Sequence, residues 1–218
     1  MLFFVLICKD FNNDRRILRI KKNKIMKILV FLTVLTISFS ITKAQEALPI
    51  NSKAPLFSAT TTQDKVFDLS EVIKEKQVVL MFYRGQWCPH CNKQLSELQD
   101  SLKYINELGA TVIAITPEKP EEIDKTVEKT SASFNLIYDE GHRIMDLYKV
   151  TFTMPKAKHA LYKTYGVDIN KASGNDDRAL PVPATYIINK HGKITGSFFD
   201  DNYKKRASVK QILEILKQ

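Results

Sequence analysis

The feature that most constrains this chain is an apolar run followed at once by two cysteines and then by a helical pattern. Residues 78–83 (Val-Val-Leu-Met-Phe-Tyr) contain no alternating polar positions, which is typical of a strand covered by helices on both faces of a sheet. Residues 84–91 then read Arg-Gly-Gln-Trp-Cys-Pro-His-Cys. Apolar residues recur at three- and four-residue spacing from Leu95 to Leu108, and Gly109 predicts the end of that helix.

The rest of the chain supplies further elements of an α/β fold. We expect strands at 57–61, 66–69, 111–116, 135–138, 185–189 and 193–199, and helices at 120–131, 143–149 and 209–216. Together they predict a central mixed β-sheet flanked by helices, with an N-terminal β-hairpin and a C-terminal hairpin. Residues 151–182 fit no periodic template, so an irregular insertion is predicted before the C-terminal hairpin.

The N-terminal residues are typical of an export leader. Met26 and a lysine precede fourteen mostly apolar residues, 28–41, and small residues stand three places and one place before the bond between Ala44 and Gln45. At about 1.5 Å per residue the apolar run is about 21 Å long, which is short for a bilayer core of about 30 Å. We therefore expect residues 1–44 to be cleaved off and the rest to be exported to the periplasm or secreted, with membrane contact only during export.

Two alternatives remain for this leader, namely an uncleaved membrane anchor and a buried helix. Met26 is an alternative start, because residues 1–25 add a second apolar stub and a basic run. On either start, Cys8 belongs to the leader. The predicted mature domain, residues 45–218, then retains only Cys88 and Cys91.

The positive charge of the chain is concentrated in this leader. The formal net charge is +9, but residues 1–44 carry nine Lys and Arg against two Asp, whereas residues 45–218 carry 24 basic against 22 acidic groups. A nucleic-acid-binding domain needs a clustered basic footprint. The nearly neutral body predicts no nucleic-acid partner, and the short basic run at 204–206 is interpreted as a solvated face.

The two cysteines of the body carry the chemistry. Cys88 and Cys91, three residues apart at a helix start, should lie on one face with their sulfurs within disulfide reach. Unpaired backbone N–H groups and the positive helix end stabilise a thiolate there. Pro89 suits the first helical position, a protonated His90 would add positive charge, and Trp87 is expected to shield the sulfurs. The pair offers one nucleophilic sulfur and a second to resolve the oxidised product.

Three other uses of the pair are less well supported by the sequence. A structural disulfide would close a very small loop and stabilise little. A zinc site needs two more ligands, and His142, His159 and His191 show no paired spacing. Covalent haem needs a histidine directly after the second cysteine, where this chain has Asn92. Redox chemistry of the thiols themselves, with no metal or cofactor, is therefore predicted.

Three separated motifs resemble a known family. Residues 82–92, 180–188 and 201–206 are similar to the peroxiredoxin-like branch of the alkyl hydroperoxide reductase/thiol-specific antioxidant (AhpC/TSA) family, within the thioredoxin-fold superfamily. The resemblance spans about residues 50–217 and implies a thioredoxin-like fold. On the peroxiredoxin template the attacking sulfur falls on Cys91, whereas on the thioredoxin template it is Cys88. The resemblance thus leaves the roles of the two sulfurs open.

Two more site residues follow from the same resemblance. Typical peroxiredoxins have an arginine facing the cysteines after the insertion, whereas thioredoxin-like enzymes have a cis-proline that shapes the substrate groove. This chain has Pro183 there, so a cis Val182–Pro183 bond is reasonable, with a trans loop residue as the alternative. Arg84 is a candidate to replace the missing arginine, with an exposed arginine at the strand end as its alternative.

These observations predict an exported thiol oxidoreductase in which Cys88 and Cys91 cycle between dithiol and disulfide. The leading expectation is a peroxidase that reduces hydrogen peroxide or organic hydroperoxides and is restored by a thioredoxin-like dithiol partner. The alternative within the same fold is a thiol–disulfide oxidoreductase acting on protein disulfides. The alternative of another class is a non-catalytic module that senses redox state or binds a metal.

Overall fold

The computed structural model describes residues 47–200 and 202–218. The predicted leader, residues 1–44 with cleavage near Ala44–Gln45, lies outside the described residues. Among the helices that are described, none combines the length and the apolar character needed to cross a membrane.

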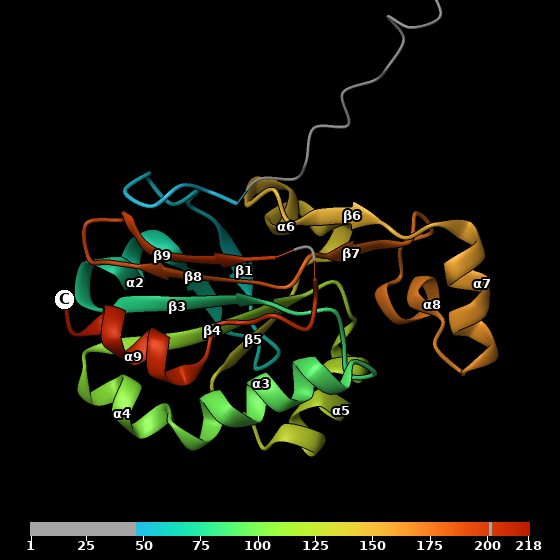
Figure 1. Ribbon diagram of the computed structural model, residues 1–218, viewed down its shortest axis with the longest axis horizontal. Coiled ribbons are helices and arrows are strands. Elements are labelled where there is room, and N and C mark those ends of the chain that lie inside the picture. The colour runs from blue at the N-terminus through green and yellow to red at the C-terminus, as the bar shows by residue number, and fades with distance from the viewer. Residues whose placement is uncertain (1–46, 201) are drawn as a thin grey trace, which may run out of the picture. The chain divides into compact units, whose positions relative to one another are not determined.

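A five-stranded mixed sheet forms the centre of the described domain (Figure 1), in the order β5-β4-β3-β8-β9. Its strands are β3 (Gln77–Phe82), β4 (Ala110–Thr116), β5 (Asn135–Tyr138), β8 (Ala184–Ile188) and β9 (Ile194–Phe199). The first three run parallel to one another, and β8 lies antiparallel to both β3 and β9. The predicted α/β architecture with a mixed central sheet is confirmed.

The sheet is covered on both faces, as the apolar sequence of β3 predicts. Because successive side chains of a strand point to opposite faces, Val78 and Leu80 enter one apolar cluster while Val79 and Met81 enter the other. All four side chains are fully buried. The helices around the sheet are α2 (Leu69–Glu75), α3 (Pro89–Asp100), α4 (Leu102–Glu107), α5 (Pro120–Thr130), α6 (Arg143–Leu147) and α9 (Val209–Leu216).

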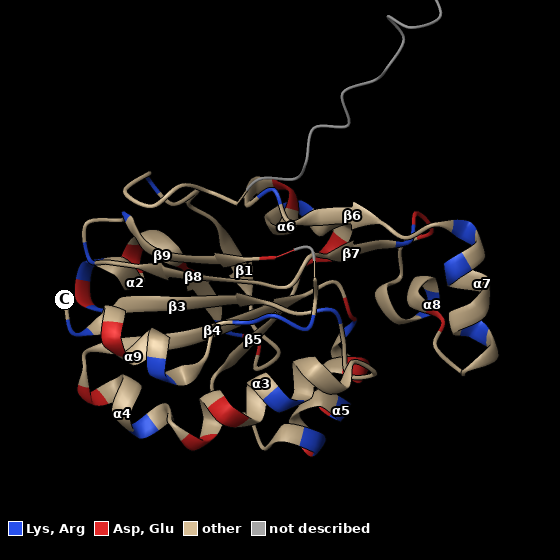
Figure 2. Cartoon of the chain, in the orientation of Figure 1, with Lys and Arg blue, Asp and Glu red and all other residues tan. Residues whose placement is uncertain are grey.

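The single helix expected over residues 95–108 is interrupted. The backbone of Ser101 leaves the helical region (φ −102°, ψ 4°) and separates α3 from α4. Leu95, Leu98 and Ile105 are nevertheless all buried in the same cluster. Lysines are interspersed with Asp and Glu along α3, α4 and α5 (Figure 2).

Both predicted hairpins are present. The N-terminal one pairs β1 (Ser58–Thr60) with β2 (Val66–Asp68), and the C-terminal one joins β8 to β9. Within the C-terminal turn the side chain of Asn189 accepts hydrogen bonds from the backbone N–H groups of His191 and Lys193. That side chain satisfies turn N–H groups in the way that makes Asn a favoured turn residue.

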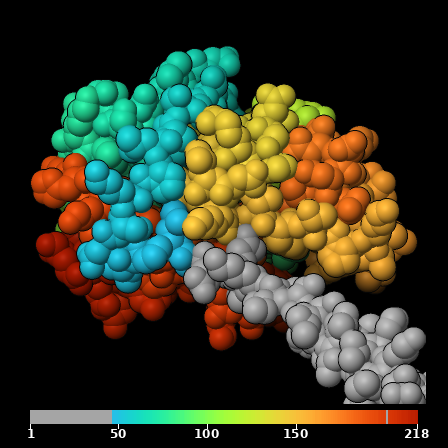
Figure 3. Space-filling model, turned by 90° about the horizontal axis from the view of Figure 1, so that it is seen from above, coloured from blue at the N-terminus to red at the C-terminus, as the bar shows by residue number. Residues whose placement is uncertain are grey.

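The expectation of an irregular insertion at 151–182 is wrong. The segment contains β6 (Thr151–Thr153), α7 (Lys156–Thr164), α8 (Ile169–Ser173) and β7 (Ala179–Pro181). Its two ends pair as an antiparallel ladder, and Met154, Ile169 and Leu180 form a small core of its own. Helix α7 was not predicted because it is polar, and His159 is its one buried residue. The insertion forms one end of the face seen in Figure 3, next to residues 140–150.

Candidate active site

The cysteine pair lies at the start of α3, just after the loop that follows β3. Cys88 is the N-cap of α3 and Pro89 is its first residue, as the sequence predicts. The backbone carbonyl of Cys88 accepts hydrogen bonds from the N–H groups of Cys91 (3.0 Å) and Asn92 (3.1 Å), so the pair opens the first helical turn. Both cysteines are free thiols. Cys88 is 2% exposed and Cys91 is fully buried.

The pKa values of the two thiols are shifted in opposite directions. A hydrogen bond from the Cys91 thiol lowers the pKa of Cys88 to about 6, and the Cys91 backbone N–H and the charges of Arg206 and Arg84 act in the same direction. Burial raises the pKa of Cys91 well above its usual value, and its interaction with Cys88 raises it further. Cys88 is therefore the thiolate of the pair, and Cys91 keeps its proton.

Arg206 is a site residue that sequence reasoning missed. Its Nη2 lies 3.5 Å from the sulfur of Cys91 and 4.0 Å from that of Cys88. The same guanidinium donates to the Oε1 of Gln94 (3.0 Å) and to the backbone carbonyl of Tyr203 (3.0 Å), which fixes its position. The interpretation of residues 204–206 as a solvated face holds for the two exposed lysines and is wrong for Arg206.

Arg84 is a buried residue at the site, so its alternative as an exposed strand-end arginine is wrong. It is 3% exposed, and its backbone N–H donates to the sulfur of Cys91 (3.5 Å). Its guanidinium lies 5.1 Å from the ring centre of Trp87 and 4.9 Å from that of Tyr203, within cation–π range. Among the ion pairs of the described residues, none includes Arg84 or Arg206. The charge of Arg206 thus lies beside the sulfurs, and that of Arg84 lies beside the aromatic rings.

An aromatic cavity of about 240 Å³ opens on Cys88. The indole of Trp87 meets Tyr162 of α7 edge to face at 5.5 Å, and His90 meets Tyr203 at 5.6 Å. Arg84 donates to the Tyr162 hydroxyl at 3.5 Å. The lining residues are Arg84, Trp87, Cys88, Pro89, His90, Tyr162, Tyr165, Val167 and Tyr203. Residues of the insertion and of the C-terminal loop therefore line the cavity together with the first turn of α3. Cys91 is not among the lining residues.

Pro183 lies at the same end of the sheet as the cysteine pair. It directly precedes Ala184, which pairs with Phe82 at the end of β3. Pro183 is buried. No peptide bond among the described residues is cis, so the Val182–Pro183 bond is trans and the expectation of a cis bond is wrong.

A buried carboxyl group behind the pair was also missed. Glu118, just after β4, is 1% exposed, and its Oε2 accepts the backbone N–H of Gln86 at 2.7 Å. Burial raises the pKa of Glu118 to about 8, with Glu122 and Cys91 acting in the same direction. Its sequence context, an acidic residue after a buried strand, offered no signal that would set it apart from a surface glutamate.

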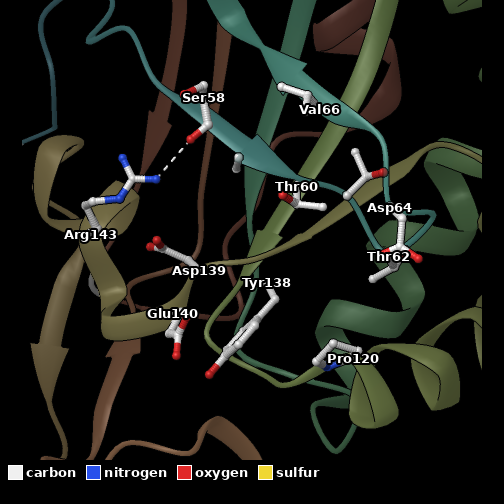
Figure 4. A pocket seen from close by; sticks show the side chains of 12 residues that line it. Ser58, Thr60, Thr62, Asp64, Val66, Pro120, Tyr138, Asp139, Glu140 and Arg143 are labelled. Atoms are coloured by element: carbon white, nitrogen blue, oxygen red, sulfur yellow. Dashed lines mark hydrogen bonds between the residues drawn. The ribbon is translucent and has the colours of Figure 1, made fainter.

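A larger cavity of about 730 Å³ lies elsewhere and contains no cysteine. It is lined by the β1–β2 hairpin, by the start of α5 and by residues 138–143 (Figure 4). Arg143 donates to the backbone carbonyl of Ser58 across it (2.9 Å). Asp139 on its wall already accepts the N–H groups of Ile144 and Met145, which occupies its carboxylate in capping α6. Across the described residues, no group of three or more His, Cys, Asp or Glu could hold a metal ion.

A thiolate at a helix start, a protonated thiol one turn behind it and two arginines define a thiol oxidoreductase. Residues 50–197 match the AhpC/TSA family, and the chain belongs to that family. The described domain therefore has the peroxiredoxin-like, thioredoxin-type fold that the three motifs predict.

Some relatives and structural neighbours are named as peroxiredoxins or peroxidoxins, and others as thiol-disulfide oxidoreductases. The chain is 26% identical over 165 residues to Peroxiredoxin Bcp of Escherichia coli K12, covering 76% of this chain and 93% of that protein. It is 24% identical over 205 residues to the thiol-disulfide oxidoreductase ResA of Bacillus cereus, covering 91% and 98%. The crystal structure of peroxidoxin BcpB from Mycobacterium tuberculosis superposes with a TM-score of 0.61 at 16% identity, covering 78% of this chain and 97% of that one.

Proposed function

We propose that this protein is a thiol-dependent peroxidase in which Cys88 attacks the peroxide and Cys91 resolves the product. The observation that carries the proposal is the position of Cys88, whose acidified thiol lies on an aromatic cavity of about 240 Å³. A small hydroperoxide fits such a space. A folded protein disulfide must bring its own backbone to a cysteine that is only 2% exposed.

The reaction follows from the positions of the groups. The Cys88 thiolate attacks one peroxide oxygen, the O–O bond breaks, and the leaving oxygen departs as water or an alcohol after taking a proton. Arg84, which lines the cavity, and Arg206, whose guanidinium lies beside the sulfurs, stabilise the negative charge that develops on the leaving oxygen. Cys91 then displaces hydroxide from the Cys88 sulfenic acid, which gives the disulfide, and the hydroxide takes up a proton to become water. An external dithiol of the thioredoxin type reduces the disulfide.

This order of attack reverses the one that the peroxiredoxin template implies. The template puts the peroxidatic sulfur on Cys91, but burial holds that thiol protonated and away from the cavity. A thiolate is the nucleophilic form of cysteine. Cys88 is therefore the better candidate, as on the thioredoxin template.

The test is rapid mixing of the reduced protein, residues 45–218, with stoichiometric hydrogen peroxide. The chain has one tryptophan, Trp87, and its fluorescence reports on the neighbouring sulfurs. We expect fast oxidation at micromolar peroxide. A Cys91→Ser variant should accumulate a dimedone-reactive sulfenic acid on Cys88, whereas Cys88→Ser should react slowly. Sulfenic acid on Cys91 of the Cys88→Ser protein, formed at the wild-type rate, would reverse the assignment.

A second candidate function is thiol–disulfide exchange with other proteins. It is favoured by one observation, the thiolate on the first cysteine with a protonated partner behind it, which is the order used in disulfide reduction. Slow reaction with peroxide together with rapid reduction of insulin disulfides would select this candidate.

We also propose that the protein acts outside the cytoplasm. The support is the leader pattern of residues 1–44. Expression of the full chain with a C-terminal tag in a Gram-negative host should give a periplasmic product whose N-terminus is Gln45. A product retained in the cytoplasm with its N-terminus at Met1 or Met26 would refute export.

A further inference from the structure

Helix α7 of the insertion presents two large apolar side chains to solvent beside the cavity of Cys88. Leu161 is 51% exposed, and Tyr165, four residues later, is 76% exposed. Residues four apart on a helix are neighbours on its surface. Tyr165 also lines the cavity, so the exposed apolar surface continues into the site. An exposed apolar patch with a polar rim is typical of an interaction surface.

The rim of this patch is positively charged. Helix α7 contains three lysines and no Asp or Glu (Figure 2). The Nζ of Lys158 lies 5.9 Å from the ring centre of Tyr162, and Lys204 directly follows Tyr203; both tyrosines line the cavity. Of the ion pairs in the described part of the chain, none includes Lys156, Lys158 or Lys204. Their charge is therefore available to an acidic partner.

The proposed cycle needs a contact surface at this position. Cys88 is the cysteine that lines the cavity, so the thiolate that reduces the disulfide must reach Cys88. Since Cys88 is only 2% exposed, a reducing protein must present its cysteine on a projecting segment whose flanking residues meet the rim.

We propose that the α7 face, which consists of Lys156, Lys158, Leu161 and Tyr165, binds an acidic segment next to the dithiol of the reducing protein. This inference rests on the proposed function, which supplies the external dithiol. The lysines attract the acidic side chains of the segment, and the leucine and tyrosine contact an apolar one. The α7 face thus gives one kind of protein the access to Cys88 that burial denies to proteins in general.

A lipid surface is the other occupant that a basic face with apolar side chains could have. Amphipathic helices that bind anionic membranes bury a broad apolar side in the lipid. The exposed apolar surface of α7 is small by comparison, because Ala157 and Ala160 add little to Leu161 and Tyr165. Its continuity with the cavity of Cys88 favours a protein that reacts there.

The exchange transfers two electrons from the partner to the pair. The first thiolate of the partner attacks the Cys88 sulfur, the bond between Cys88 and Cys91 breaks, and Cys91 leaves as a thiolate that takes up a proton. The second thiol of the partner loses its proton and displaces Cys88 from the mixed disulfide. Cys88 leaves as a thiolate, and the partner is oxidised to a disulfide.

Two synthetic dithiol peptides test the charge of the partner. Both contain the core Cys-Gly-Pro-Cys next to a leucine, and one is flanked by glutamates whereas the other is flanked by lysines. The disulfide form of the protein is prepared with diamide, and its reduction is followed by the fluorescence of Trp87, the one tryptophan. Comparing each peptide between protein variants cancels the difference in the reactivity of the peptides themselves.

The decisive variant is Lys156→Glu/Lys158→Glu. At low ionic strength it should slow the acidic peptide at least about tenfold and accelerate the basic one, the scale of electrostatic steering. The difference should vanish at high salt, which screens exposed charges. Lys190→Glu/Lys210→Glu is the matched control, because it changes the net charge equally at two exposed lysines outside α7. Dithiothreitol, an uncharged small dithiol, should reduce all these proteins at the same rate.

The apolar part of the α7 face has its own test. Leu161→Gln should slow the acidic peptide about fivefold at every salt concentration, because a half-buried contact of a leucine is lost. Leu147→Gln, at a leucine of α6 that is 43% exposed, is the control and should leave the rate unchanged.

The remaining outcomes each decide the proposal. Equal rates of the acidic peptide with the wild type and Lys156→Glu/Lys158→Glu overturn it, as does equal slowing of the peptides and dithiothreitol. Co-sedimentation with phosphatidylglycerol vesicles that this variant loses, with unchanged peptide rates, would assign the face to a lipid surface and also overturn it. If peroxide does not oxidise the protein but the diamide-formed disulfide shows the expected preference, the peroxidase function fails while the docking role of α7 stands.

Discussion

The guanidinium of Arg206 lies 3.5 Å from the sulfur of Cys91 and 4.0 Å from that of Cys88. Arginine stays protonated under all physiological conditions, so its charge at this distance favours the thiolate form of whichever sulfur can ionise. Burial raises the pKa of Cys91 well above its usual value, so the charge mainly favours ionisation of Cys88. The long-range contact between the C-terminal loop and the first turn of α3 is thus part of the site chemistry.

Replacing Arg206 should make Cys88 a weaker acid. In Arg206→Met the charge beside the sulfurs is lost, and we expect the pKa of Cys88 to rise by about one unit, the scale of one neighbouring charge. The rate of alkylation by iodoacetamide as a function of pH measures this shift. Lys205→Met, which removes an exposed charge from the same loop, is the control. Equal pKa values in Arg206→Met and the wild type would contradict the role assigned to Arg206.

The stability of the reduced protein should depend on pH through Cys88. Its pKa is lowered on folding, to about 6 from 9.0, so the stabilising contribution is present above the unfolded value and is lost as the pH falls through about 6. Relative to Cys88→Ser, the free energy of unfolding should rise by on the order of a few kcal/mol between about pH 6 and pH 9. Urea unfolding of both proteins under reducing conditions measures it.

Comparison with Cys88→Ser is needed because Glu118 acts in the opposite direction. Burial raises its folded pKa to about 8 from 4.5, so its contribution is greatest below the unfolded value and is lost as the pH rises. The carboxyl group is present in both proteins, and its effect therefore largely cancels in the difference. A difference that is flat over the same range would contradict a lowered pKa for Cys88.

Local patterns predicted most of the fold and half of the site. The strands β3 and β5 and the helix α5 were found because continuous apolar runs and helix-start prolines act over a few residues. The cysteine pair was found for the same reason, since its spacing is contained in one helical turn. Helix α7 was not predicted, because its exposed polar face carries no apolar period.

The second half of the site comes from distant parts of the chain. Arg206 stands 115 positions from the cysteine whose sulfur it contacts, and Glu118 stands 32 positions from its partner Gln86. Such pairs are created by the sheet order, which puts β4 beside β3 and returns the chain past β9 to the start of α3. No local spacing in the sequence encodes them. The similarity of residues 201–206 to a known family was the one available sign that Arg206 has a specific place.

Gly85 should be one of the least replaceable residues of the loop before the cysteines. Its φ is +150°, which disfavours any other residue, and an added Cβ would lie 2.3 Å from Glu118 and 2.6 Å from Trp87. Gly85→Ala should therefore lower the free energy of unfolding by about 3 kcal/mol or more, from backbone strain plus overpacking. Gly109→Ala is the control, because its φ is also positive (+70°) but no atom lies within 4 Å. It should cost about 1 kcal/mol, and equal losses in urea unfolding would contradict the crowding at Gly85.

Tyr162 should decide how large a substrate can reach Cys88. It packs against Trp87 at 5.5 Å and accepts a hydrogen bond from Arg84, so it holds the insertion over the cavity. An aromatic contact of this kind contributes about 0.5–1.5 kcal/mol, and its loss in Tyr162→Ala should make opening of the cavity up to about tenfold easier. Reduction of insulin disulfides should accelerate accordingly, while the reaction with hydrogen peroxide should change little.

The control for this variant is Tyr104→Ala, a change at an exposed tyrosine on α4. It should leave both reactions at the wild-type rate. If insulin reduction in Tyr162→Ala stays as slow as in the control while the protein remains folded, the contact of Tyr162 with Trp87 does not exclude protein disulfides. The preference for small peroxides would then have to come from the chemistry of the two arginines, because the walls of the cavity would no longer account for it.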